Sequence, residues 1–119
     1  MKILIIDDDP LHLSSLETSL SVRGYECRSF LCPVSAIDAY RDEDFDAVIT
    51  AVKMLEISGE EVLESILDID PEARVILITG FNEITIDPGN RKGIFAFFRK
   101  PVIIEELVGT LEKIEKLQV

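Results

Sequence analysis

Polar side chains follow the ends of three apolar runs in this sequence, and together they could bind a cation and a phosphoryl group. Asp7 and Asp8 follow the first run, Thr79 follows a later one, and Lys100 follows the last. Two neighbouring carboxylates repel each other unless a cation lies close to them, and Mg²⁺ binds through one or two carboxylates. A hydroxyl and an ammonium can hold phosphoryl oxygens by hydrogen bonding and charge.

The group that this chemistry lacks is a nucleophile. It should be a carboxylate at the end of the apolar run at residues 47–49, because ligands of open α/β sheets lie outside the carboxyl ends of the strands. The residue at that position is Ala51, whose methyl group can neither accept a phosphoryl group nor bind a metal. Thr50 is adjacent, but it should point the other way along the strand and is a poor substitute.

Five apolar segments would form the strands that position these groups. Residues 2–6, 47–49 and 75–78 are continuous apolar runs, which is typical of strands covered on both faces. Residues 25–30 and 94–98 are the other two strand candidates. Helical segments separate the strands. This alternation predicts an α/β fold, (βα)5, in which a doubly wound, five-stranded parallel sheet carries helices on both faces.

Local signals give the ends of several helices. Asp9 can cap a helix whose first residue is Pro10, and Gly24 should end that helix. A short helix is expected over residues 33–40, followed by a polar connection at residues 41–44.

The helix expected between the fourth and fifth strands is interrupted. Residues 87–90 read Asp-Pro-Gly-Asn, which is typical of a turn, and Pro and Gly both oppose helix formation. We therefore expect this fourth helix to be short, broken or absent. The last helix, in contrast, should have a regular apolar face made of Ile104, Leu107, Leu111 and Ile114.

Length and composition favour a single small domain over residues 1–119. The net charge of −11 argues against direct binding of nucleic acid, because phosphate contacts require Lys and Arg. Cys27 and Cys32 lie too far apart for a C-x-x-C pair, and we interpret both as reduced thiols of a cytoplasmic protein. No apolar run approaches the ~20 residues that cross a bilayer, so a membrane span is not expected.

These motifs, in this order, resemble the receiver domain of a two-component response regulator over essentially the whole chain. Each motif alone is weak, but five in order with matching spacing make the resemblance specific. The resemblance implies a flavodoxin-like receiver fold and a signalling module rather than an enzyme. The matching pieces are residues 5–10, residues 45–50, Met54 with Ser58-Gly59, residues 76–80 and Lys100-Pro101.

The resemblance implies a metal role for the acidic pair. In receiver domains such a pair binds Mg²⁺, so Asp7 and Asp8 would be metal ligands, with Asp8 the closer one. The backbone carbonyl of Lys53 would be the third ligand from the protein. The aspartate that follows the third strand of the family takes a phosphoryl group from a histidine of a sensor kinase or phosphotransfer protein.

The resemblance also implies a switch. Thr79 would be the switch hydroxyl, Phe97 the switch aromatic, and Lys100 the ammonium that contacts the phosphoryl oxygens, with a cis bond between Lys100 and Pro101. A change at these residues alters the face made by the fourth helix, the fifth strand and the fifth helix. This face binds an output domain or partner protein. A homodimer is also compatible with the family.

Three departures from the family pattern predict altered chemistry. Ala51 occupies the phosphoacceptor position, Leu55 stands where proline is usual, and the fourth helix is interrupted. Without the acceptor carboxylate the chain should not be phosphorylated, and Mg²⁺ should bind more weakly. Lys100, lacking its acceptor partner, should turn toward Asp7 or Asp8.

Two origins of Ala51 remain open: deliberate replacement of a native aspartate, or a natural receiver that signals without phosphate. A phosphorylation-independent scaffold or dimerisation domain is the alternative function. A flavodoxin-like carrier is a further one, although the carboxylates of residues 7–9 would repel a phosphate where such a protein binds it. We interpret His12 as exposed, and Phe97 as a packing residue more than a working switch.

Overall fold

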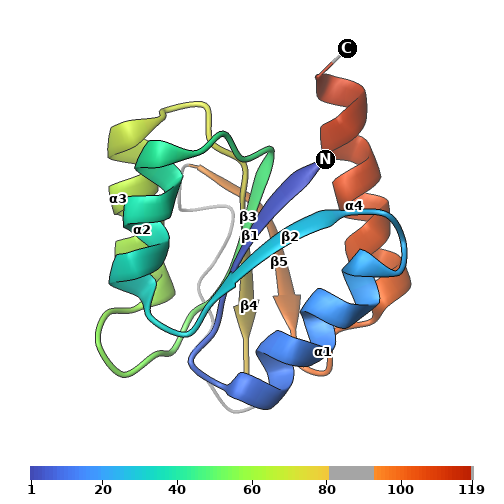
Figure 1. Ribbon diagram of the computed structural model, residues 1–119, viewed down its shortest axis with the longest axis horizontal. Coiled ribbons are helices and arrows are strands. Elements are labelled where there is room, and N and C mark those ends of the chain that lie inside the picture. Colours follow the sequence, from blue (N-terminus) through green and yellow to red (C-terminus); the bar gives the residue numbers. More distant parts are fainter. Residues whose placement is uncertain (81–92, 119) are drawn as a thin grey trace.

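The computed structural model describes residues 1–80 and 93–118, which form a five-stranded parallel sheet with helices on both faces (Figure 1). All strand pairs are parallel and the strand order is β2-β1-β3-β4-β5. The predicted fold class is therefore confirmed. The strands are β1 (Lys2–Ile6), β2 (Glu26–Phe30), β3 (Ala47–Ala51), β4 (Val75–Thr79) and β5 (Ile94–Arg99).

Four helices cover the sheet within these residues, two on each face (Figure 1). On one face, α1 (Pro10–Ser21) and α4 (Ile104–Leu117) bury Leu16 and Leu111 against Ile49 of the sheet. On the other face, α2 (Pro33–Asp42) and α3 (Gly59–Ile69) bury Ala36 and Val62 against residues of β1, β3 and β4. None of these helices is long and apolar enough to cross a membrane.

The burial of the strands explains their sequence patterns. Every residue of β3 and β4 is buried, because helices cover both faces of these central strands. Strand β2 lies at an edge, and its residues are exposed or half-buried, with none fully buried. The continuous apolar runs therefore mark the strands whose carboxyl ends lie in the middle of the sheet.

Two helix starts lie beside the carboxyl edge and are fixed by local hydrogen bonds. Asp9 Oδ1 accepts from the N–H groups of Leu11 and His12, and Pro10 is the first helical residue of α1, as predicted. Ser58 and Glu61 cap α3 reciprocally. Helix α1 starts four residues after the end of β1, and the start of α3 lies beside the end of β3, where the N–H of Gly59 donates to the carbonyl oxygen of Val52 over 2.7 Å.

Some boundaries differ from the predictions. Helix α2 continues to Asp42, so the predicted polar connection starts two residues late; the Arg41–Asp38 ion pair belongs to this last turn. Strand β4 includes Thr79 and β5 includes Arg99, each one residue longer than predicted. The interrupted fourth helix falls in residues 81–92, which lie outside the described residues.

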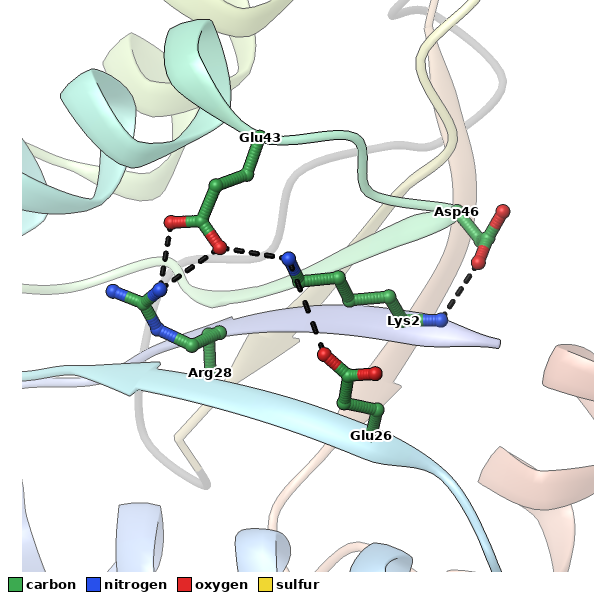
Figure 2. Close-up of polar contacts among 5 residues, drawn as sticks. All are labelled: Lys2, Glu26, Arg28, Glu43 and Asp46. Atoms are coloured by element: carbon green, nitrogen blue, oxygen red, sulfur yellow. Dashed lines mark hydrogen bonds and ion pairs between the residues drawn. The ribbon is translucent and has the colours of Figure 1, made fainter.

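A network of charged side chains joins the strands at the opposite, amino-terminal edge (Figure 2). Lys2 Nζ donates to Glu43 Oε1 over 2.7 Å, and Arg28 Nη1 donates to both oxygens of the same carboxylate. The backbone N–H of Lys2 donates to Asp46 Oδ2 over 2.6 Å. We call Lys2, Glu26, Arg28, Glu43 and Asp46 the amino-edge network.

Candidate functional site

The register of the sheet brings the predicted site residues to one edge. Ile6 pairs with Thr50 across β1 and β3, and Ala51 pairs with Ile78 across β3 and β4. Because all strands are parallel, the residues that follow these pairs meet at the carboxyl edge. The residues at or just beyond that edge include Asp7, Ala51, Thr79 and Lys100.

Asp7 is the buried centre of this site, with 2% of its surface exposed. Its Oδ2 lies 2.5 Å from His12 Nδ1 and 3.5 Å from Lys100 Nζ. A carboxylate in this position only accepts, so His12 Nδ1 carries a hydrogen and donates it. The other oxygen, Oδ1, accepts from the backbone N–H of Asp9 over 3.0 Å. Both oxygens of Asp7 are therefore engaged within the chain.

These contacts decide the protonation of Asp7. Burial acts to raise the pKa of this carboxyl, because it disfavours the charged form. The hydrogen bonds from His12 and from the N–H of Asp9, with the charge of Lys100, outweigh burial and lower the pKa below its ordinary value. Asp7 is thus an anion that the chain itself neutralises.

Lys100 reaches this anion across the sheet. It follows β5, whereas Asp7 follows β1, and β3 and β4 lie between these two strands. The ion pair therefore passes over the carboxyl ends of the two central strands. Lys100 has turned toward the acidic pair, as the sequence predicts, and its backbone N–H donates to the carbonyl oxygen of Thr79 over 2.8 Å. The predicted cis bond between Lys100 and Pro101 is present.

Asp8 contacts the loop that leaves β3. Its Oδ2 accepts from the backbone N–H of Leu55 over 2.9 Å, and its side chain is less buried than that of Asp7. The Leu55 side chain is not packed against the site, because 95% of the residue surface is exposed. The loop is therefore attached to the acidic pair through its backbone.

Ala51, the last residue of β3, brings only a methyl group to the carboxyl edge. The residue is 5% exposed, and its methyl group belongs to the face of β3 that carries Ala47 and Ile49. Thr50 lies on the opposite face, fully buried, and its hydroxyl donates to the carbonyl oxygen of Ala51 over 3.0 Å. The expectation that Thr50 points away from the site is confirmed.

Two further predicted residues lie beside the site. Thr79 is fully buried at the end of β4. Phe97 of β5 is half-buried and packs against the cluster under α2 and α3, the arrangement expected of a packing residue. Their part in a switch remains a prediction.

The described residues do not fit a tightly held Mg²⁺. No group of three His, Cys, Asp or Glu residues that could hold a metal ion occurs in residues 1–80 and 93–118. Both oxygens of Asp7 and one oxygen of Asp8 already accept hydrogen bonds from the chain. A cation would have to displace these donors to reach the acidic pair.

Sequence reasoning missed two of these donors. The interpretation of His12 as an exposed residue is wrong, because 19% of its side chain is exposed and it contacts Asp7. The signal was its place in the first turn of the helix that follows the acidic pair. The Leu55 N–H was also missed, because the sequence analysis considered only the side chain at this position, and every residue except proline offers a backbone donor.

Comparisons of the sequence and of the fold with known proteins indicate the same family. The family model of the response regulator receiver domain matches residues 3–112. The response regulator receiver protein CpdR of Brucella abortus (strain 2308) is 29% identical over 113 residues, covering 94% of each chain. The transcriptional regulatory protein ZraR of Escherichia coli (strain K12) is 30% identical over 112 residues, which are 93% of this chain but only 25% of ZraR.

A solved structure supports the fold assignment. The receiver domain protein of Clostridium thermocellum superimposes with a TM-score of 0.87 at 29% identity, covering 99% of this chain and 98% of the other. The likeness thus extends over all five strands. The chain also spans only about a quarter of ZraR, so the activities of that longer protein are not carried over from the match.

Proposed function

The chain belongs to the response regulator receiver domain family, and from this premise we propose that it is a two-component receiver that does not accept a phosphoryl group. The observation that carries the proposal is the methyl group of Ala51 at the end of β3. Phosphoryl transfer to a receiver needs a nucleophilic oxygen, and the neighbouring Thr50 hydroxyl lies on the other face of the strand.

In this proposal the other site residues occupy their usual positions, but no phosphoryl transfer takes place there. Asp7 and Asp8 would be the side-chain ligands of a cation, and the Lys53 carbonyl the backbone ligand. Thr79 and Lys100 would lie where a phosphoryl group binds in other receivers. Mg²⁺ then binds more weakly than in an Ala51→Asp variant, because one carboxylate is absent. The chain acts as a binding module and not as an enzyme.

The partners follow from the family. A sensor histidine kinase or phosphotransfer protein would dock at the carboxyl edge, and an output domain or partner protein would bind the face that includes β5 and α4. We place this function in the cytoplasm, since Cys27 and Cys32 are both free thiols. Ala51 fixes such a receiver in one signalling state, whether it was introduced or evolved.

Phosphate incorporation tests the proposal directly. The native chain, Ala51→Asp and Ala51→Asn are incubated with acetyl phosphate and Mg²⁺, and their intact masses are measured. We expect a phosphate adduct on Ala51→Asp alone, because only this variant supplies a carboxylate. Ala51→Asn is the matched control, since it has a similar shape without the nucleophile.

Each other outcome has a definite meaning. An adduct on the native chain would show that another residue accepts the phosphoryl group, and the proposal would be wrong. An unlabelled but folded Ala51→Asp protein would show that the pocket differs from a working receiver at more than residue 51. The second result would contradict the hypothesis that Ala51 alone prevents phosphorylation of this site.

A further inference from the structure

The acidic pair is satisfied by hydrogen-bond donors of the chain itself, and this arrangement has a consequence beyond the missing carboxylate. One oxygen of Asp7 accepts from His12 and lies 3.5 Å from Lys100 Nζ, and the other accepts from a backbone N–H. One oxygen of Asp8 accepts from the N–H of Leu55. Three of the four carboxylate oxygens therefore have partners without any metal.

The Leu55 donor depends on a residue type. A proline at this position would have no N–H and could not make the bond to Asp8. Leucine supplies the N–H, and 95% of the residue surface is exposed, so packing does not explain the choice of leucine. The contact of this position with the site is made by the backbone alone.

The His12 donor is held in place by the start of α1. Its backbone N–H donates to the capping residue Asp9, and its ring is mostly buried, with Nδ1 facing Asp7. His12 and Lys100 also line one cavity of about 230 Å³ between α1 and the start of α4. The two side chains thus approach the same carboxylate oxygen from one side of the site.

We propose that His12, Lys100 and the N–H of Leu55 replace a metal ion at the acidic pair and hold the receiver in a metal-free arrangement. The proposal rests on the proposed function and names how its site is regulated. Mg²⁺ must displace these donors before it can bind, so its affinity is limited by them in addition to the absence of a carboxylate at residue 51. The hydrogen bond from the Leu55 N–H also keeps the loop after β3 attached to Asp8.

Removing single donors tests this proposal. Mg²⁺ is titrated by calorimetry into the native chain, His12→Ala and Leu55→Pro, all of which keep Ala51. We expect each variant to bind Mg²⁺ roughly tenfold more tightly, the effect of releasing one hydrogen bond to a charged group. Circular dichroism verifies that each variant is folded, and His12→Ala decides the question if Leu55→Pro does not fold.

Two matched controls isolate the donors. Ser15 lies on the same helix as His12 and lines the same cavity, but within residues 1–80 and 93–118 no hydrogen bond joins it to Asp7, so Ser15→Ala is one control. Leu55→Ala keeps the backbone N–H and changes only the exposed side chain. Both controls should bind Mg²⁺ as the native chain does.

The outcomes separate this proposal from the proposed function. Unchanged Mg²⁺ affinity in folded His12→Ala and Leu55→Pro, with tighter binding in Ala51→Asp, would overturn the role of the donors and leave the unphosphorylated receiver intact. Conversely, a phosphate adduct on the native chain would contradict the proposed function whatever the titration shows. Tighter Mg²⁺ binding in both controls would mean that any substitution near the site raises the affinity, and this result would also overturn the proposal.

Discussion

The two edges of the sheet both carry paired charges, but in different surroundings. In the amino-edge network the side chains of Glu26 and Arg28 are 71% and 47% exposed, and the strands are joined at the surface (Figure 2). At the carboxyl edge, the Asp7 side chain is 3% exposed and contacts two basic side chains. At the first edge the four side chains of the ion pairs are 24–71% exposed, whereas at the second edge the anion itself is buried.

This difference sets what each cluster can contribute. Exposed ion pairs contribute only about 0–1 kcal/mol, because water and salt screen them. A buried group that loses its hydrogen-bond partner costs about 1–3 kcal/mol, and more when it is charged. The amino-edge network therefore tolerates substitution, whereas the carboxyl edge depends on each donor. The contribution of a charged pair to stability therefore depends more on its burial than on the edge at which it lies.

The largest effect should come from the close packing of the carboxyl edge. A Cβ added at Gly59 would collide with the backbone carbonyl of Ala51. We expect Gly59→Ala to lower the free energy of unfolding by about 3 kcal/mol, because rigid backbone must move. Denaturant unfolding measures this change.

Gly109 in α4 provides the control for Gly59. A Cβ there would meet nothing within 4 Å. Gly109→Ala should raise the free energy of unfolding by about 0.5–1 kcal/mol, because alanine favours helix. Equal losses in the two variants would contradict the idea that the carboxyl edge is the tightly packed one.

The second prediction compares one donor from each edge. His12→Ala should lower the free energy of unfolding by about 2 kcal/mol, since it removes a hydrogen bond to the buried Asp7. Arg28→Ala should cost less than about 1 kcal/mol, because its ion pair with Glu43 is partly exposed. The comparison fails if thermal and denaturant unfolding give the opposite order.

Added salt sharpens the same comparison. The cost of Arg28→Ala should shrink in high salt, because an exposed pair is screened. The cost of His12→Ala should change little, since its partner is buried. A salt response of equal size at both positions would show that burial does not separate the two edges.

The sequence predicted the elements of this comparison better than their contacts. The runs that became β3 and β4, and the Asp9-Pro10 start of α1, follow from local rules of burial and capping that short segments obey alone. Lys100 was placed correctly because parallel strands must end at one edge.

The missed contacts depend on information that a pattern of residue types lacks. His12 reaches Asp7 because of the rotation of α1 about its axis, which tertiary packing decides. The Leu55 donor belongs to the backbone, so the identity of the side chain hides it. The end of α2 at Asp42 was missed because polar residues are equally compatible with a last helical turn and with a loop. Site geometry was therefore less predictable than fold.

A third prediction concerns pH at the amino edge. The hydrogen bond from Lys2 and the charge of Arg28 hold the pKa of Glu43 below its ordinary value. A lowered folded-state pKa means that the stabilisation is present above the ordinary glutamate pKa of about 4.3 and is lost as pH falls through the folded value.

Glu43→Gln tests this dependence. The variant should be less stable than the native chain at neutral pH, by less than His12→Ala is, and the difference should vanish in acid. Urea unfolding at a series of pH values measures it. A difference that persists unchanged below pH of about 3 would show that packing, and not the charge of Glu43, accounts for it.

The smallest effect compares the two ends of a single strand and leaves stability unchanged. Cys27 lies in β2 near the amino edge, where burial raises the pKa of its thiol. Cys32 lies beyond the carboxyl end of β2, where the backbone N–H and hydroxyl of Ser35 lower the pKa of its thiol. Because the thiolate is the reactive form, iodoacetamide at neutral pH should label Cys32 before Cys27, as followed by peptide mass. Labelling of Cys27 first would mean that access to the thiols, and not the helix start beside Cys32, sets their reactivity.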